Sequence, residues 1–155
     1  MIWMQRDAGD FLDYLRIECG MSPHTIASYR RDLAQFSRFS HGAIGASTVQ
    51  GFPAWLRQRK YAIASVARAS AALRSFLRFL QREGRIQDDL AQLVRAPRAR
   101  SHLPHVLATL EIERLAQNTS PRDRAILELL YASGARVSEL VSMKITDVSL
   151  DLGYV

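Results

Sequence analysis

Apolar residues recur every three or four positions near the start of the chain, the spacing of a helix with one buried face. Four of them, Phe11, Leu12, Tyr14 and Leu15, predict a first helix that stops near Gly20. Ser22 and Pro23 then predict a second helix, because serine caps a first turn and proline loses no hydrogen bond there. The apolar face of this second helix is formed by Ile26, Tyr29, Leu33, Phe36 and Phe39.

The pattern continues to about residue 95. Residues 42–51 contain three glycines and predict a loop, and a short helix is expected over 53–59. The clearest helix follows and ends near Gly84, with a continuous stripe made by Val66, Ala69, Leu73, Phe76, Leu77 and Leu80. A last short helix is expected around Leu90, Leu93 and Val94. Short helices with small connections predict a compact all-α domain over residues 1–95.

Residues 96–107 predict a linker, because Pro97 and Pro104 interrupt helix and no apolar face repeats. A second helical region is expected over residues 108–155. Thr109 is its first candidate N-cap, and Ser120 with Pro121 repeats the capping pattern. Residues 125–131 predict a helix buried on most sides, broken at Gly134 and followed by another helix. A turn is expected at 146–147, and 153–155 has the pattern of a beginning strand.

The charge pattern favours a nucleic-acid partner in the first region. Residues 1–107 carry 16 basic and 8 acidic side chains, whereas residues 108–155 carry 5 and 7. Only Lys60 and Lys144 of the basic residues are lysines, and arginine suits phosphate oxygens and guanine edges. An arginine-rich genome would give the same usage. No signal peptide or membrane-length apolar run is present in the sequence, and Cys19 stands alone, so we expect a cytoplasmic protein.

Several segments resemble, in the same order along the chain, segments of the tyrosine recombinases, the phage-integrase and Xer-type enzymes. In the first domain the similar sequence segments are 22–26 (Ser-Pro-His-Thr-Ile), 29–33 (Tyr-Arg-Arg-Asp-Leu) and 73–79. The second carries them at 107–115, 122–126 and 131–140 (Tyr-Ala-Ser-Gly-Ala-Arg-Val-Ser-Glu-Leu). The resemblance implies a mainly α chain: an N-terminal SAM-like, core-binding helical bundle, then the truncated helical start of a recombinase catalytic domain.

By this resemblance Arg136 is the first of two arginines that hold the scissile phosphate. Guanidinium donors stabilise the negative charge that builds up when a tyrosine hydroxyl attacks a phosphodiester. Glu139 lies one helical turn further on and is expected to orient Arg136, although an ordinary surface ion pair has the same spacing. No histidine is followed at the third position by arginine, and Tyr154 is too close to Arg136 to be the nucleophile. We therefore expect the chain alone to be inactive in cleavage.

The resemblance also implies that two helices of the first domain lie against the major groove of double-stranded DNA. The expected DNA-binding residues are Thr25, Ser28, Arg30, Arg31, Arg68, Arg74 and Arg78, mostly as phosphate contacts, and the alternative is a solvated charged face. No metal ion, ATP or redox cofactor is implied. His102 and His105 lack the companions of a metal site and are expected near phosphate.

Three functions remain open. The first is site-specific DNA recombination through a 3′-phosphotyrosine, with this chain as the DNA-binding N-terminal portion of an enzyme that assembles as a tetramer of protomers on paired sites. The second is a naturally truncated, non-catalytic DNA-binding protein, and the third is a helical protein-interaction module. For a fragment we expect the apolar surface of Ile126, Leu129, Leu130 and Val137 to be exposed.

Overall fold

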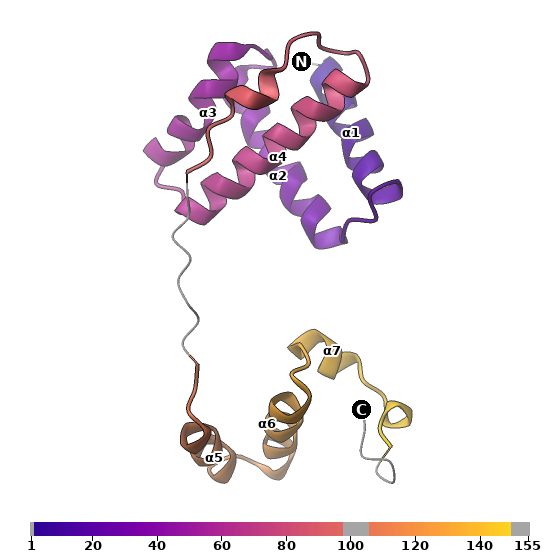
Figure 1. Cartoon of the computed structure of the whole chain (residues 1–155), viewed down its shortest axis with the longest axis vertical. Coiled ribbons are helices and arrows are strands. Elements are labelled where there is room, and N and C mark those ends of the chain that lie inside the picture. The colour runs from indigo at the N-terminus through magenta and orange to yellow at the C-terminus, as the bar shows by residue number, and fades with distance from the viewer. Residues whose placement is uncertain (1, 98–105, 150–155) are drawn as a thin grey trace. The chain divides into compact units, whose positions relative to one another are not determined.

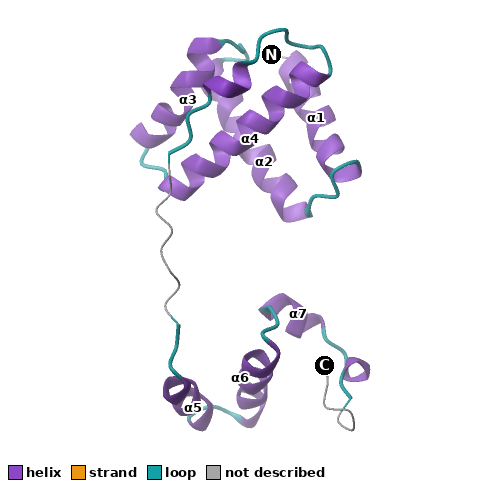
Figure 2. Cartoon of the chain, viewed as in Figure 1, coloured by secondary structure: helices purple, strands orange, loops and turns teal. Residues whose placement is uncertain are grey.

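A computed structural model describes residues 2–97 and 106–149, with side chains from residue 6 onward. The chain divides into two compact units, residues 1–101 and 102–155, each treated by itself below. Most of the predicted linker, including His102 and His105, and the predicted strand at 153–155 lie outside the described residues. The described residues form seven α-helices and two 3-10 turns with no β-strand, so the prediction of a mainly α chain is confirmed (Figures 1 and 2).

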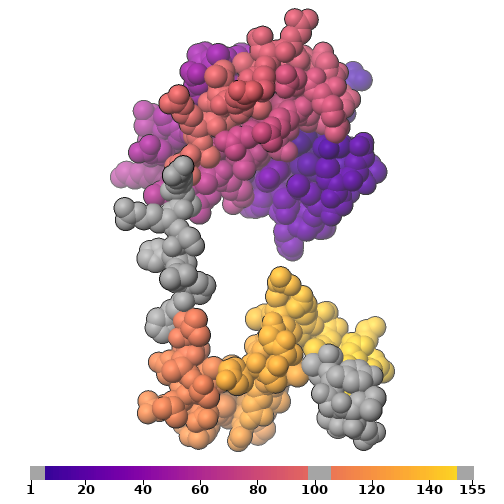
Figure 3. Space-filling view, in the orientation of Figure 1, coloured from indigo at the N-terminus to yellow at the C-terminus, as the bar shows by residue number. Residues whose placement is uncertain are grey.

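The first unit is a bundle of four helices and one 3-10 turn. Its elements are α1 (Ile2–Ile17), α2 (Pro23–Ser40), α3 (Ala46–Gln58), α4 (Ile63–Arg82) and η1 (Leu90–Leu93). Helices α2 and α4 pack against each other at the centre, with α1 against one side of the pair and α3 against the other (Figure 1). The turn η1 packs on α3 and α4, and the segment after α4 covers this side of the unit in Figure 3.

The core is built from the stripe predicted on α4 and from aromatic rings of the other helices. Leu73, Phe76, Leu77 and Leu80 are all fully buried. Rings pair across the bundle, with centroids 5.4 Å apart for Phe11–Phe76 and 5.2 Å for Phe36–Phe52. Each such side chain contributes roughly 1.5–3 kcal/mol by its burial. Tyr29 is half-buried and packs on this core, as predicted.

Ser22 caps α2 as the sequence predicts, since its Oγ accepts the Thr25 N–H at 3.2 Å. No start was predicted for α1, which begins at Ile2. One other boundary was predicted wrongly, because α3 begins at Ala46, inside the segment predicted to be a loop. At that start the Thr48 Oγ1 accepts the Gly45 N–H at 3.0 Å. Gly51 lies inside this helix, where an added Cβ would come within 3.2 Å of the Phe39 ring, so this glycine provides room rather than a break.

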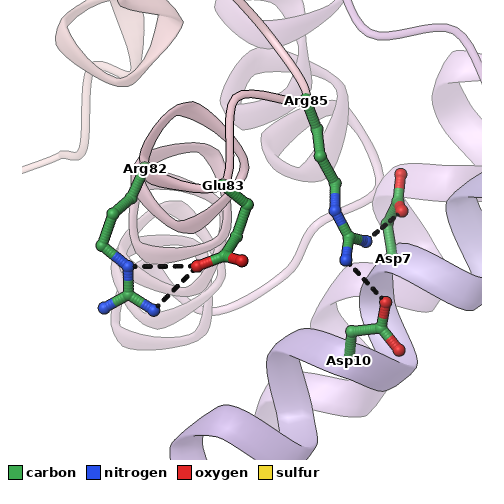
Figure 4. A network of polar contacts seen from close by, with 5 residues as sticks. All are labelled: Asp7, Asp10, Arg82, Glu83 and Arg85. Carbon is green, nitrogen blue, oxygen red and sulfur yellow. Dashed lines mark hydrogen bonds and ion pairs between the residues drawn. The ribbon is translucent and has the colours of Figure 1, made fainter.

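An ion-pair network closes the bundle between its first helix and the turn after its last (Figure 4). The Arg85 guanidinium contacts the carboxylate of Asp7 and donates to Asp10 at 2.8 Å. Arg82 donates to the Glu83 carboxylate at 3.2 Å and its guanidinium lies 4.2 Å from the centroid of the Tyr14 ring. Arg85 therefore ties the turn after α4 to α1 by charge, and Arg82 ties the end of α4 to α1 by packing on the Tyr14 ring.

The second unit contains α5 (Thr109–Gln117), α6 (Pro121–Ser133), α7 (Val137–Ser142) and η2 (Ile145–Asp147). Ser120 caps α6, and Gly134 ends it in the left-handed region at φ 64°, both as predicted. The cap of α5 falls at Ala108, one residue before the predicted Thr109, because the Glu111 carboxylate accepts the Ala108 N–H at 2.8 Å. Lys144 is exposed just before η2, and its N–H donates to Asp147 at 2.9 Å.

No residue of 106–149 is buried, so the prediction that 125–131 is buried on most sides is wrong for this chain. Ile126, Leu129 and Leu130 are half-exposed and Val137 is exposed. The unit is a row of short helices, and packing between neighbours alone leaves their apolar faces open. No described helix is long and apolar enough to cross a membrane.

Candidate nucleic-acid interface

The junction of α2 and α4 holds a buried ion pair. The Asp32 side chain is 2% exposed, and its two oxygens accept hydrogen bonds from Arg68 Nε at 2.9 Å and Nη2 at 3.0 Å. These bonds raise the pKa of the Arg68 guanidinium above its usual value. The Arg68 side chain is 46% exposed, so one edge of the pair reaches the surface. Asp32 belongs to the segment 29–33 that resembles the recombinases, but no signal in the sequence connected it with Arg68.

The start of α2 lies next to this pair. Ser28 precedes Asp32 by one helical turn, and Arg31 Nη2 donates to the Ser28 Oγ at 3.2 Å. Thr25 is half-buried one turn earlier, where its hydroxyl lies 3.0 Å from the Ser22 Oγ. Thr25 and Ser28 therefore lie two turns and one turn before Asp32 on one face of α2, where both are half-buried, whereas Arg31 is exposed.

Arg74 and Arg78 occupy different surroundings although they are one turn apart on α4. Arg74 is half-buried, and its Nη2 donates to the backbone carbonyl of Val94 at 2.8 Å. Arg78 is exposed and has no hydrogen-bond or ion-pair partner among the described residues. The geometry gives Arg74 a contact within the fold and leaves the Arg78 guanidinium free for an anion.

Arg30 is two residues from both Ser28 and Asp32, which places it about 200° around α2 from them. It lines one shallow hollow together with its neighbour Arg31. It borders a groove of about 680 Å³ with a floor of apolar side chains and two further basic residues, Arg38 and His41. The seven predicted DNA-binding residues therefore do not share one face of the first unit. The sequence reasoning missed Arg38 and His41, whose only signal is their helical spacing from Arg30.

In the second unit Arg136 is the N-cap of α7 and Glu139 lies in the first turn. The Glu139 carboxylate accepts the Arg136 backbone N–H at 2.7 Å and its Nη1 at 3.0 Å. These bonds, the backbone one first, lower the pKa of Glu139 below its ordinary value. The Arg136 side chain remains 82% exposed. The arrangement fixes the backbone N–H and one guanidinium nitrogen of Arg136, while most of its N–H donors face solvent, which suits binding of a phosphate.

Residues 6–97 and 106–149 contain no group of three or more His, Cys, Asp or Glu side chains placed to hold a metal ion. The candidate anion-binding side chains of the first unit described above are arginines and the hydroxyl groups of Thr25 and Ser28. Such donors bind and stabilise phosphates through hydrogen bonds and charge.

Two family models match successive parts of the chain. Residues 9–84 match the phage integrase N-terminal SAM-like domain, and residues 105–155 match the phage integrase family. The tyrosine recombinase XerD of Listeria monocytogenes serotype 4b (strain F2365) is 37% identical over 160 residues, covering 94% of this chain and 54% of that protein. The tyrosine recombinase XerC of Roseiflexus castenholzii is 38% identical over 162 residues, covering 96% of this chain and 52% of that protein.

A crystal structure of XerA recombinase is 28% identical, with a TM-score of 0.48 and coverage of 94% of this chain and 52% of that one. The chain spans about half the length of the curated relatives it matches.

Proposed function

Because this chain belongs to the tyrosine recombinase (phage integrase) family and its relatives are Xer recombinases, we propose that it binds double-stranded DNA through its first unit. The observation that supports this most directly is the exposed basic surface of the SAM-like bundle. Arg31 on α2 and Arg78 on α4 are exposed, and the Arg68 side chain on α4 is 46% exposed. Cations on a helical surface neutralise backbone phosphates and give affinity without reading sequence.

We further propose that the activity served by this binding is site-specific recombination. In such a reaction a tyrosine hydroxyl attacks a phosphodiester, which forms a 3′-phosphotyrosine and releases a 5′-hydroxyl. Attack of a 5′-hydroxyl on the phosphotyrosine then rejoins the strands and frees the tyrosine. Arg136 is the residue of this chain that would stabilise the charge on the non-bridging oxygens. Glu139 would hold Arg136 in place through the two hydrogen bonds at 2.7 and 3.0 Å. Protomers assembled on paired sites are the proposed partners.

Fluorescence anisotropy with a labelled duplex of mixed sequence, repeated at rising sodium chloride, tests the binding. We expect affinity to fall steeply with salt, with a slope of roughly −0.9 for each phosphate neutralised. Arg31→Ala and Arg78→Ala should each reduce that slope by about one unit. Arg57→Ala is the matched control, because Arg57 is an exposed arginine of α3 outside the proposed surface. Binding that is insensitive to salt would instead favour a helical protein-interaction module.

The intact mass of the protein from its source cells separates recombination from DNA binding alone. A mass about twice the 17.5 kDa of this chain would match the coverage of 52–54% in its relatives and support the recombinase. A mass near 17.5 kDa together with salt-dependent DNA binding would support a non-catalytic DNA-binding protein.

A further inference from the structure

The Asp32–Arg68 pair fixes a guanidinium in one orientation at the surface. A carboxylate that is 2% exposed is strongly unfavourable without a partner, and Arg68 supplies both of its hydrogen bonds. The two residues are 36 positions apart, so the fold and not the local helix brings them together. A fixed side chain loses less conformational entropy when it binds a ligand than a free one does.

The edge of Arg68 that Asp32 leaves open has a defined shape. A guanidinium carries five N–H donors in one plane, and the carboxylate takes one from Nε and one from Nη2. The remaining Nη1 and Nη2 donors form the outer edge of the same plane, and the side chain is 46% exposed. Two parallel donors on one edge match two acceptors side by side, such as a phosphate or the O6 and N7 atoms of guanine.

The residues next to Arg68 on the exposed face of α4 have small side chains. One turn before and one turn after it on α4 stand Ala64 and Ala71, which are both exposed. Because these neighbours are small, Arg68 is the longest side chain on this part of the exposed face of α4. A helix with such a profile can lie close to base edges, because the major groove of DNA admits an α-helix.

The net charge of the Asp32–Arg68 pair favours one of the two possible ligands, a phosphate or a guanine edge, over the other. Asp32 cancels most of the long-range field of Arg68, so the pair attracts a phosphate less than the exposed Arg31 and Arg78 do. A base edge is recognised by hydrogen-bond geometry at contact and needs no net charge. We propose that Asp32 is a positioning residue that presents Arg68 to a guanine in the major groove, which makes Arg68 a residue that determines sequence preference. This inference rests on the DNA-binding function proposed above.

Selection of bound duplexes from a library with a randomised central window tests the inference on the full chain. We expect the wild-type protein to enrich guanine at one position roughly 5- to 100-fold over other bases. In Asp32→Asn, which keeps the size of the side chain but removes its charge, this preference should fall to within about two-fold. Affinity for an unselected duplex should stay equal or rise, because the variant gains one net positive charge.

Arg68→Lys is the second variant, and it decides the matter if Asp32→Asn does not fold by circular dichroism. Lysine keeps the positive charge beside Asp32 but offers no planar pair of donors. We expect it to lose the guanine preference while its salt slope stays that of the wild type. Retained preference in the folded variants, or a uniform loss on every duplex, would overturn the inference. A wild-type protein that binds duplexes without any base preference would also overturn it, whereas failure to bind any duplex would overturn the proposed function itself.

Discussion

Arg74 and Val94 are joined by a hydrogen bond of 2.8 Å from the guanidinium to the backbone carbonyl, which attaches the middle of α4 to the residue that follows η1. Val94 is buried, so its carbonyl has little access to water. The contact makes Arg74 part of the fold of the first unit, although its position on α4 also suits a DNA-binding residue.

Arg74→Ala should lower the free energy of unfolding of the first unit by about 1.5–3 kcal/mol, because a hydrogen bond from a charged donor is lost and a buried carbonyl loses its partner. Arg78→Ala removes the same side chain one turn away, where it is exposed and unpaired among the described residues, and should change stability by less than about 0.5 kcal/mol. Urea unfolding followed by circular dichroism measures both. Equal losses in the two variants would argue against this role of Arg74.

Phe76→Ala should cost about 3–5 kcal/mol, because Phe76 is fully buried and its ring contacts Phe11 at a centroid distance of 5.4 Å. Phe76→Leu retains most of the apolar volume and should cost clearly less. Thermal unfolding of the first unit compares the two. A small effect of the alanine variant would mean that the α1–α4 contact is not a main part of the core.

Ser22→Ala should destabilise the first unit by about 1 kcal/mol, because the Thr25 N–H loses the acceptor that now lies at 3.2 Å. Ser22→Asp keeps an acceptor and adds negative charge near a helix N-terminus, so it should be neutral or slightly stabilising. Hydrogen exchange of the first-turn amides of α2 gives the local readout. Protection that is unchanged in Ser22→Ala would contradict the cap.

The start of α7 should weaken in acid. The pKa of Glu139 is lowered in the folded chain from its ordinary value of 4.5, so its contribution is complete above that value and is lost as the pH falls through the lowered pKa. The chemical shift of the Arg136 amide, followed by NMR from neutral pH to acid, should report this titration. Glu139→Gln should abolish the pH dependence of that amide while leaving the other amides unchanged.

Local chemistry made much of this fold predictable. The stripe on α4, the caps at Ser22 and Ser120, and the spacing of Arg136 and Glu139 depend on residues a few positions apart, and the structure contains all of them. The start of α3 was not predicted, because the three glycines of residues 42–51 indicated a loop, whereas Gly51 lies inside the helix against the distant Phe39 ring.

The candidate site was predictable only as a set of residue types. Pairing of Arg68 with Asp32 and of Arg74 with Val94 spans 36 and 20 residues, and only the packing of α4 on α2 and η1 creates it. A sequence pattern identifies an arginine on a polar face, but the tertiary contacts decide which of its donors remain free. The separation of Arg30 from Ser28 and Asp32 around α2, by contrast, is local helix geometry and follows from their spacing in the sequence.

The contacts of Arg85 with Asp7 and Asp10 bring the beginning of α1 beside the turn that follows α4. The core of the first unit does not end at that turn, because Leu90, Ala91 and Val94 of the following segment are buried in it. A cassette cut at Arg85 would keep these ion pairs but lose part of the core, so a first unit that is to fold in another protein has to extend beyond Val94.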